Sequence, residues 1–445
     1  MKQLITLIIS IGLISFARGA EIDWSGYLRT DNRLQLVNDY DFSWHEYRLN
    51  LTAELKPFNR AHFYTNFWIR SLGFPAVKTS ADLGNRDKLI PLDLELRSAY
   101  IDLYGFLLKN VDLRIGRQRI AWGTGDKINP TDNINPEDLE DIWDFGRHLS
   151  SDGIQAGIYL GDYTLNLIFI PIFTPGILPA GDWRSTLMPD INLPSGLELG
   201  EITDSIILPE NNLKKSSEFG LKLSRTIFGY DISLSYLYGR DDLPISQKVI
   251  FSPDTITGRV NLKTELIYPG MQIAGLDAAG AVGDLGIWFE LALCFPERIV
   301  QTIDLSKLGM GVIDSVILDN KLFARYLIGL DYTFRNGLYI NLQYLHGFTG
   351  ERGKTNLEDY LFLGSEYLFL NDRLKLSPLN SSLEIKDYKD LKQNLALVYT
   401  PELTYYPMDN VELSIGVRLI QGGENTKFGR IKNDDELYFR VKYSF

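Results

Sequence analysis

Short segments in which apolar and polar residues alternate recur along the chain, and this repetition limits the possible folds more than any other feature. Successive side chains of a β-strand point to opposite faces, so each segment predicts a strand with one apolar and one polar face. Sixteen such segments can be marked, at residues 22–34, 43–55, 61–70, 93–104, 111–120, 152–160, 163–170, 216–226, 230–239, 270–280, 286–295, 322–334, 338–348, 392–402, 410–420 and 435–445. The chain is therefore expected to be all-β.

The connections between these segments alternate in length. Short links such as 56–60, 105–110 and 161–163 alternate with links of eight to about 45 residues. Outer-membrane barrels have this asymmetry, because their periplasmic turns are short and their external loops are long. The pattern predicts a transmembrane antiparallel β-barrel of about 16 strands. Residues 240–270 could supply two more strands, which leaves 18 as the alternative count, but we interpret them as a hairpin within a long loop.

Charged side chains gather on one face of the predicted strands. In the segment 43–55, Glu46, Arg48 and Glu54 share one face and Tyr47 lies on the other. An Arg or Lys that faces lipid near the bilayer midplane costs about 2 to 4 kcal/mol. The polar faces are therefore predicted to line a lumen, and a lumen lined in this way should hold water.

The amino-terminal sequence indicates export. An apolar run at 4–16 is followed by Ala17 and Gly19, which fit the small-residue positions of a signal-peptidase site. This predicts a signal peptide at 1–19 and one barrel domain at 20–445. The later sequence contains no apolar run of about 18 residues, so a protein that crosses the membrane with helices is excluded.

The last segment, residues 437–445, alternates strictly and ends in an aromatic residue. Its apolar side carries Phe439, Tyr443 and Phe445. This ending resembles the closing strand of Gram-negative outer-membrane β-barrels, where the terminal aromatic residue helps the assembly machinery to recognise the chain. The resemblance implies the cell outer membrane as location, with outer-membrane lipid and the barrel-assembly machinery as partners. Because a sheet edge cannot be satisfied in lipid, residues 20–33 are expected to pair with this segment.

The link 116–153, after the fifth segment, carries the strongest functional signal. It contains two Asn-Pro-x-Asp units, at 129–132 and 135–138. Asn as a cap, Pro at the first helical position and acids in the first turn favour a helix start. The second unit predicts a short helix at 136–145 that Gly146 ends. Its apolar side would carry Leu139, Ile142 and Trp143.

This chain is similar to sixteen-stranded general porins in strand count, in the position of this link and in its acidity. There the loop after the fifth strand folds into the barrel and narrows it, with carboxylates opposite basic side chains of the wall. The strings GRQRIAWG and NPTDNINPED also resemble porin-like and substrate-selective channel families of Gram-negative bacteria. The implied constriction residues are the acids Glu137, Asp138, Glu140, Asp141 and Asp144 and the wall arginines Arg29, Arg48, Arg97 and Arg114. Alternatively, the Asn-Pro units only cap helices and the acids form a solvated surface.

Net charge and residue types narrow the possible partners. The formal net charge is −12, and it becomes −14 without Lys2 and Arg18 of the predicted signal peptide. This argues against nucleic acid and biases a pore toward cations. One cysteine, Cys294, excludes an intrachain disulfide. The four histidines are scattered, and the oxygen-rich run 132–138 lacks the glycine and final Glu of an EF-hand, so no metal and no cofactor are expected.

The leading hypothesis is a channel for passive diffusion of small hydrophilic solutes, and the resemblance allows a homotrimer. One alternative is an outer-membrane enzyme of the phospholipase or protease type. Others are a selective transporter of an oligosaccharide or an apolar compound, and an adhesive barrel with the long loop 171–215 as its surface. His148 precedes Ser150, Ser151 and Asp152, but nearness in sequence is weak evidence for a nucleophile and its base, so the chain is not expected to be an enzyme.

Overall fold

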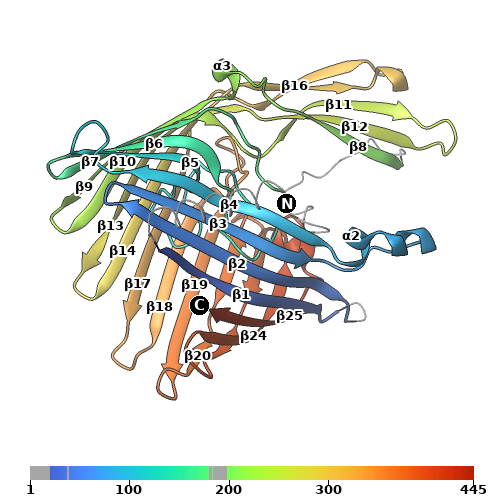
Figure 1. Ribbon diagram of the computed structural model, residues 1–445. Helices are drawn as coiled ribbons and strands as arrows, with labels where there is room; N and C mark the ends of the chain where they lie inside the picture. The colour runs from blue at the N-terminus through green and yellow to red at the C-terminus, as the bar shows by residue number, and fades with distance from the viewer. Residues whose placement is uncertain (1–20, 38–39, 180–182, 184–197) are drawn as a thin grey trace.

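The computed structural model describes residues 21–37, 40–179, 183 and 198–445 (Figure 1). The predicted signal peptide at 1–19 lies outside these residues, and so do residues 180–182 and 184–197 of the predicted loop 171–215. The described helices are all short: η1 (Ser80–Gly84), α2 (Arg86–Leu89), α3 (Leu213–Ser216), η3 (Ser306–Leu308), α4 (Leu391–Asn394) and η4 (Phe428–Ile431). None of the helices in this part of the chain is long and apolar enough to cross a membrane.

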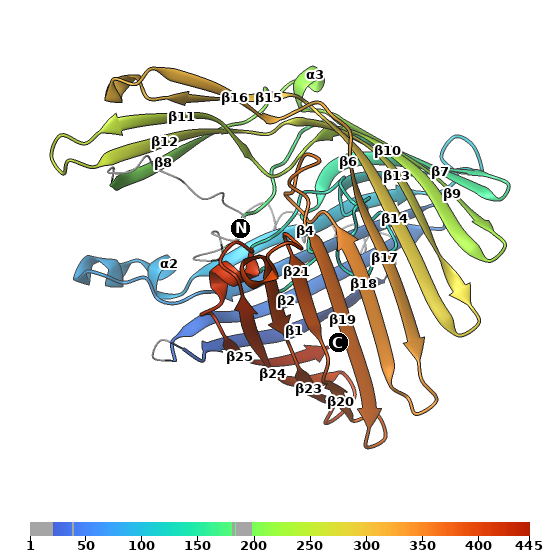
Figure 2. The ribbon, with the colours of Figure 1, turned by 180° about the vertical axis from the view of Figure 1, so that it is seen from behind.

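The main sheet is a closed antiparallel barrel with 18 strand positions (Figures 1 and 2). In order around the wall they are β1 (Ile22–Gln35), β2 (Phe42–Phe58), β3 (Ala61–Leu72), β4 (Leu92–Leu103), β5 (Val111–Gln118), β6 (Ser151–Leu160), β7 (Tyr163–Ile170), β9 (Glu218–Ile227), β10 (Tyr230–Arg240), β13 (Gly270–Val282), β14 (Leu285–Pro296), β17 (Phe323–Thr333), β18 (Tyr339–His346), β19 (Asp359–Phe369), β20 with β21 (Leu374–Ser377 and Ser381–Ile385), β22 with β23 (Leu395–Tyr399 and Glu402–Tyr405), β24 (Val411–Gly422) and β25 (Glu436–Ser444). The all-β barrel prediction is confirmed, and the alternative count of 18 is the right one.

The count of sixteen is wrong because β19 and the position shared by β20 and β21 do not alternate. Tyr360 and Phe362 of β19 belong to an apolar cluster on the inner side of the wall, so aromatic residues stand where alternation requires polar ones. Between β20 and β21, Pro378 interrupts the ladder, because proline has no N–H to donate. The side chain of Asn380 accepts a hydrogen bond from Ser365 N at 2.7 Å across this interruption.

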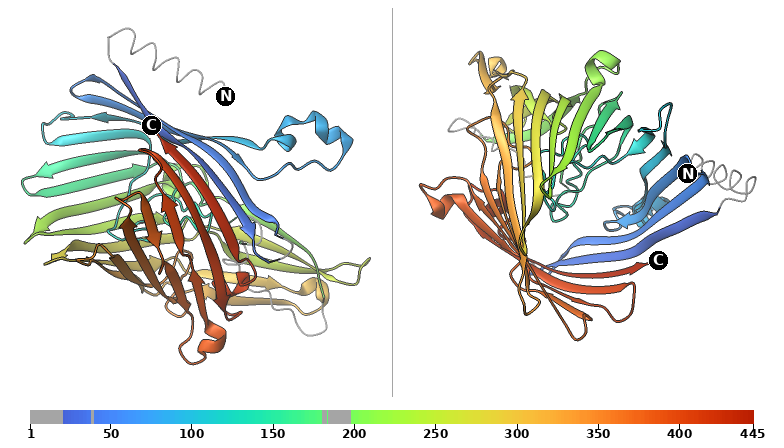
Figure 3. Two further views of the ribbon diagram at one scale, coloured as in Figure 1. Left: turned by 90° about the horizontal axis from the view of Figure 1, so that it is seen from below. Right: turned by 90° about the vertical axis from the view of Figure 1, so that its left-hand side faces the viewer.

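The barrel closes between its last and first strands, as predicted. Gly26 N donates to Phe445 O at 2.9 Å, and Phe445 N donates to Gly26 O at 3.0 Å. From there β1 and β25 stay paired as far as Gln35 and Glu436. Figure 3 shows the wall from two further sides. Every barrel strand therefore has a partner on both sides, as a strand in a lipid bilayer requires.

The two faces of the wall differ as their alternation predicts. On β2, Glu46 and Arg48 are 1% and 2% exposed, whereas Tyr47 between them is 48% exposed. On β24, Arg418 is buried and Ile415 is exposed. The inner face is therefore polar and the outer face apolar.

A second sheet, which we call the outer sheet, lies beyond the barrel on the side of the long links (Figure 1). Three links supply its strands: β8 (Leu199–Ile207) between β7 and β9, β11 (Ile245–Pro253) with β12 (Val260–Ile267) between β10 and β13, and β15 (Ile299–Asp304) with β16 (Val312–Leu318) between β14 and β17. Phe251, Val260, Leu262 and Leu305 form its core. The interpretation of 240–270 as a hairpin within a loop is thus right, and the two extra barrel strands lie elsewhere.

Candidate functional site

Residues 119–150 link β5 to β6, and we call them the inner segment. Asp126 accepts a hydrogen bond from Asn341 Nδ2 at 2.6 Å, near the short turn that precedes β18. Asp141 accepts one from Arg33 Nη1 at 2.8 Å, near the opposite, long-link end of β1. The inner segment therefore contacts the inner face of the wall near the short-turn end and near the long-link end of the barrel. The two contacts lie on strands that are far apart in the wall.

The predicted helix at 136–145 is wrong, because these residues form turns and isolated bridges. Asp138 N donates to Arg147 O at 2.9 Å, and Leu139 N donates to Ile177 O at 3.0 Å. Buried backbone groups need partners, and here neighbouring extended chain supplies them in place of a helical ladder.

The Asn-Pro units fasten the inner segment to the strands that it connects. Asn135 Oδ1 accepts from Ile120 N at 2.6 Å, and Asn135 Nδ2 donates to Gln118 O at 3.1 Å. Asp132 forms an ion pair with Arg119. These side chains replace the backbone pairs that are lost where the chain leaves β5, so their role is to fix a loop rather than to start a helix.

Two of the predicted acids pair with arginines of the wall. Arg33 of β1 holds Asp141, and Arg70 Nη2 of β3 donates to Glu140 at 3.0 Å. Burial alone would raise the pKa of Asp141, but the charge and hydrogen bonds of Arg33 hold it far below its ordinary value. The Asp141 carboxylate is therefore charged and fixed in position.

A third acid, Asp138, lies between two arginines. It accepts hydrogen bonds from Arg97 Nη1 of β4 at 3.2 Å and from Arg147 Nη2 of the inner segment at 2.8 Å. The guanidinium carbons of Arg97 and Arg48 lie 4.2 and 3.8 Å from the ring centroid of Trp68. Cation–π contacts of this kind stabilise a desolvated guanidinium, so the aromatic ring helps to hold the basic side of this site.

Three of the predicted wall arginines do not meet the inner segment. Arg29 Nη2 and Arg48 Nε donate to Glu46 at 3.1 and 2.7 Å, and Arg114 Nε donates to Asp102 at 2.6 Å. They therefore pair along the wall, and Arg97 alone of the predicted row contacts an acid of the inner segment among the described residues.

Of the remaining predicted acids, Glu137 forms no ion pair with an arginine among the described residues, and Asp144 forms only a long one. Glu137 Oε1 accepts from Thr349 Oγ1 at 3.1 Å. Asp144 is 41% exposed, and its nearest cation is Arg147 Nη1 at 3.8 Å. Asp126 and Lys127 are exposed as well.

Two anchoring residues of the wall were missed by the sequence analysis. Glu290 of β14 is fully buried and accepts hydrogen bonds from Thr124 N at 2.6 Å, Gly125 N at 2.7 Å and Thr131 Oγ1 at 2.9 Å. Its signal in the sequence is a single carboxylate within an apolar strand. Arg70 shares the inward parity of polar residues on β3 and could have been found by that rule.

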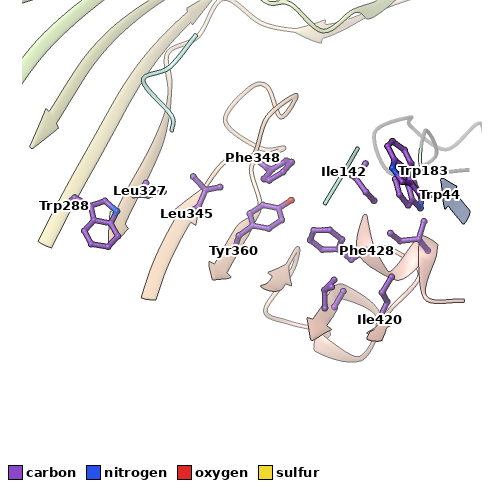
Figure 4. Packing of buried hydrophobic residues seen from close by; sticks show 13 residues of the cluster. Trp44, Ile142, Trp183, Trp288, Leu327, Leu345, Phe348, Tyr360, Ile420 and Phe428 are labelled. Carbon is purple, nitrogen blue, oxygen red and sulfur yellow. The ribbon is translucent and has the colours of Figure 1, made fainter. Parts of the chain in front are cut away.

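An apolar cluster supports the inner segment on its other side (Figure 4). Trp143 stacks on Phe428 with ring centroids 6.4 Å apart, and Phe145 meets Phe348 edge-on at 5.7 Å. Ile142 is buried in the same cluster. Phe428 comes from the link between β24 and β25, so a second link also reaches the inner side of the wall.

His148, Ser150 and Asp152, which the sequence offers as a base, a nucleophile and an acid, do not form a catalytic arrangement. His148 Nε2 lies 3.6 Å from Glu137 Oε1, whereas Ser150 Oγ contacts Ser98 Oγ at 3.2 Å and Asp152 is exposed. Within residues 21–37, 40–179, 183 and 198–445, no group of three or more His, Cys, Asp or Glu side chains is arranged to hold a metal ion.

Solved structures with a similar fold are outer-membrane porins. Pseudomonas aeruginosa OpdK with vanillate aligns with a TM-score of 0.51 and 10% identity over 96% of this chain and 98% of that chain. Pseudomonas aeruginosa OccD3 (OpdP) aligns with a TM-score of 0.50 and 10% identity over 95% of this chain and 91% of that chain. No protein-family model and no curated protein matches the sequence. At these identities the likeness concerns the fold alone: the chain has the fold of outer-membrane porins.

Proposed function

We propose that the protein is an outer-membrane channel through which small hydrophilic solutes diffuse passively. Barrels of 16 to 18 strands enclose an interior wide enough for an aqueous path. The polar inner face supports this, because charged side chains such as Glu46 and Arg48 need water or partners on the inner side of the wall.

The inner segment is the constriction of this channel in our proposal. The observation that best supports this proposal is the two salt bridges from the segment to the wall, Arg33 with Asp141 and Arg70 with Glu140. Removing one partner of a buried ion pair costs about 3 to 5 kcal/mol, so these contacts hold the segment in one place. The charges left beside the solute path are then Asp126, Lys127 and Asp144.

Planar-bilayer recording of the purified protein tests the proposal. An ohmic single-channel current is expected from the wild type. Deleting residues 132–144 should raise the conductance and admit larger solutes while heat-modifiable barrel folding stays intact. Deleting residues 254–259, the turn between β11 and β12, is the matched control and should leave the conductance unchanged. A folded wild type without current would reject the channel, and unchanged conductance after the first deletion would reject the constriction.

Export and assembly belong to the same proposal. Residues 1–19 are cleaved, the short turns face the periplasm, and three copies form a trimer. The barrel-assembly machinery recognises Phe439, Tyr443 and Phe445. The exposure of all three aromatic side chains on the outer face supports this, and truncation of Phe445 should lower outer-membrane levels of the protein far more than it changes the folded channel.

An adhesive surface is the second candidate function. Its supporting observation is the outer sheet, whose edge strands carry exposed Ile202, Ile206, Val312 and Ile313. Exposed apolar patches of this kind mark binding surfaces. Replacing residues 245–267 with a short Gly-Ser linker should abolish attachment of cells to a surface without changing the conductance, if adhesion is the function.

A further inference from the structure

Two further links contact the aromatic rings of the inner segment. They are residues 347–358 between β18 and β19 and residues 423–435 between β24 and β25, and we call them the supporting links. Phe348 of the first link and Phe428 of the second each pack on an aromatic ring of the inner segment, and both belong to the apolar cluster of Figure 4. The inner segment therefore contacts the supporting links as well as the arginines of β1, β3 and β4.

Each of these two aromatic residues is fixed through its backbone by a buried glutamate. Glu351 accepts a hydrogen bond from Phe348 N, and Glu384 of β21 accepts one from Phe428 N, both at 2.9 Å. Glu351 is 7% exposed and Glu384 is fully buried. Hydrogen bonds to an ionised acceptor are stronger than neutral ones. The positions of the two rings therefore depend on where these two carboxylates lie.

The ammonium group of Lys427 joins the two glutamates. Its Nζ donates to Glu351 Oε1 at 2.5 Å and lies 4.0 Å from Glu384 Oε1. It also donates to Glu358 Oε2 at 2.5 Å and to the Tyr360 hydroxyl at 2.8 Å. Three carboxylates on the inner side of the wall thus surround this ammonium, and they come from one supporting link and from β21.

The burial of this cluster makes the ammonium important. Without it, three like charges would remain close together with little access to water, and an unpaired buried charge is strongly destabilising. Lys386 Nζ lies 3.9 Å from Glu358 Oε1, but its side chain is 40% exposed, so solvent screens its charge. Lys432 of the same supporting link as Lys427 pairs only with Glu424, which is 77% exposed. The two lysines of this link therefore differ in what their charges hold.

Trp143 connects the supporting links to the anchored acids of the inner segment. Phe428 stacks on its ring with centroids 6.4 Å apart, and the guanidinium carbon of Arg418 on β24 lies 5.1 Å from the same ring. Trp143 N donates to Asp141 Oδ1 at 3.1 Å, and Asp141 is one of the acids bound to the wall. A shift of Phe428 therefore reaches the residues that we place in the constriction.

We propose that Lys427 is a positioning residue for the constriction. Its ammonium ties the two supporting links to each other, so that Phe348 and Phe428 hold the inner segment through β19 and β21. The arginines of β1, β3 and β4 hold the same segment through the other part of the wall. The effect of Lys427 on solutes rests on the proposed channel function, whereas its hold on the inner segment does not.

Hydrogen exchange of the folded protein in detergent tests this hold without any current. Lys427→Met removes the ammonium, so protection of the Phe348 and Phe428 amides should fall at least about tenfold, and protection of residues 142–145 should fall with it. Lys427→Arg should stay close to the wild type, because a guanidinium also binds carboxylates. Lys432→Met removes an exposed charge of the same link and is the matched control, which should equal the wild type.

Two results of this experiment would overturn the proposal. One is equal protection of residues 142–145 in the wild type and in Lys427→Met. The other is a loss in Lys427→Arg or Lys432→Met as large as the loss in Lys427→Met, because the buried charge would then not be the cause.

Phe428→Leu provides a second variant in case Lys427→Met does not fold. It removes the ring that stacks on Trp143 and leaves the charged cluster in place. Residues 142–145 should lose protection in this variant, while the Phe348 amide, which bonds to Glu351, should keep it. Unchanged protection of residues 142–145 would overturn the hold of the supporting links on the inner segment.

Single-channel recording then separates the hold from the channel. In a conducting protein, Lys427→Met should raise the conductance, but less than the deletion of residues 132–144 does, because the arginines of β1, β3 and β4 still hold the segment. A loss of protection in Lys427→Met with the conductance of the wild type would overturn the positioning role. A folded wild type without current would reject the proposed channel, and the exchange results alone would then decide the hold.

Discussion

The inner segment and the outer sheet are both built from long links, but they satisfy their polar groups in opposite ways. The inner segment has almost no regular structure of its own, and its polar groups pair with the wall through Arg33, Arg70 and Glu290. The outer sheet pairs its own strands and packs its own small core around Phe251 and Leu262. A link that enters a barrel thus takes its partners from the wall, whereas a link outside must supply them itself.

This difference predicts where substitutions act. Buried ion pairs are sensitive to loss of one partner, because the remaining charge stays desolvated. A small sheet in solvent depends instead on its few buried apolar side chains. The two regions should therefore fail independently, apart from the hydrogen bond that Glu137 N donates to the Asp242 carboxylate just before β11.

Asp141→Ala should have the largest effect, since it removes the acid that holds Arg33 on the inner side of the wall. We expect the inner segment to lose about 3 to 5 kcal/mol of local stability, measured by hydrogen exchange of residues 138–147. The double variant Arg33→Met with Asp141→Leu leaves neither charge of the pair buried, so it should recover most of this loss. Asp31 still has a basic partner in this variant, because it keeps its bond from Arg440 Nε at 3.0 Å. Asp314→Asn in the outer sheet is the control. A loss in the double variant equal to that of Asp141→Ala would show that the pair does not anchor the segment.

Leu305→Ala should destabilise the outer sheet and nothing else. Leu305 is buried in the core of that sheet, next to Phe251. Truncating a buried leucine costs about 2 to 5 kcal/mol, and we expect the lower end because the core is small. Limited proteolysis of residues 245–267 should become faster while the heat-modifiable shift of the barrel is unchanged. Faster exchange in the inner segment of this variant would contradict the independence of the two regions.

Glu290→Gln tests the second anchor of the inner segment with a smaller change. The carboxylate accepts from Thr124 N, Gly125 N and the Thr131 hydroxyl, so an amide nitrogen in its place would face donors. One unsatisfied buried group costs about 1 to 3 kcal/mol. Exchange of residues 123–131 should accelerate accordingly, with Glu366→Gln on β19 as the control. Equal exchange in the wild type and Glu290→Gln would rule out this anchor.

The sequence predicted the barrel because its alternation is imposed locally, strand by strand. The polar inner face followed from the same rule, whereas the closure of β25 on β1 followed from the cost of an open sheet edge in lipid. The rule fails on β19, where Tyr360 faces the inner apolar cluster and alternation is lost. Strand count therefore depended on a tertiary contact that no local pattern reveals.

The site was predicted less completely, and for a related reason. The acids at 137–144 were identified from composition. Which arginine pairs with each acid depends on the position of the side chains in the folded barrel, and the sequence does not give that position. Arg97 was anticipated, whereas Arg70 was not singled out. The helix was predicted from cap signals at Asn135 and Pro136, and it is absent because the backbone of Leu139 bonds to Ile177, 38 residues away in sequence. Local cap signals do not form a helix where residues distant in sequence supply the hydrogen-bond partners of the backbone.

The smallest expected effect concerns ion selectivity and the acid that the wall leaves unpaired. Asp144 is 41% exposed and 3.8 Å from Arg147, so in the proposed channel its charge faces water. Asp144→Asn should lower the permeability ratio of K⁺ to Cl⁻ by less than about twofold, because solvent and salt screen an exposed charge. The measurement is the reversal potential in a KCl gradient around 0.1 M, repeated near 1 M, where the Debye length of about 3 Å should abolish the difference. Asp204→Asn, on the outer sheet and away from the path, should match the wild type at both concentrations. If the low-salt ratio of Asp144→Asn equals that of the wild type, Asp144 does not border the path of the ions, and the inner segment acts by its bulk alone.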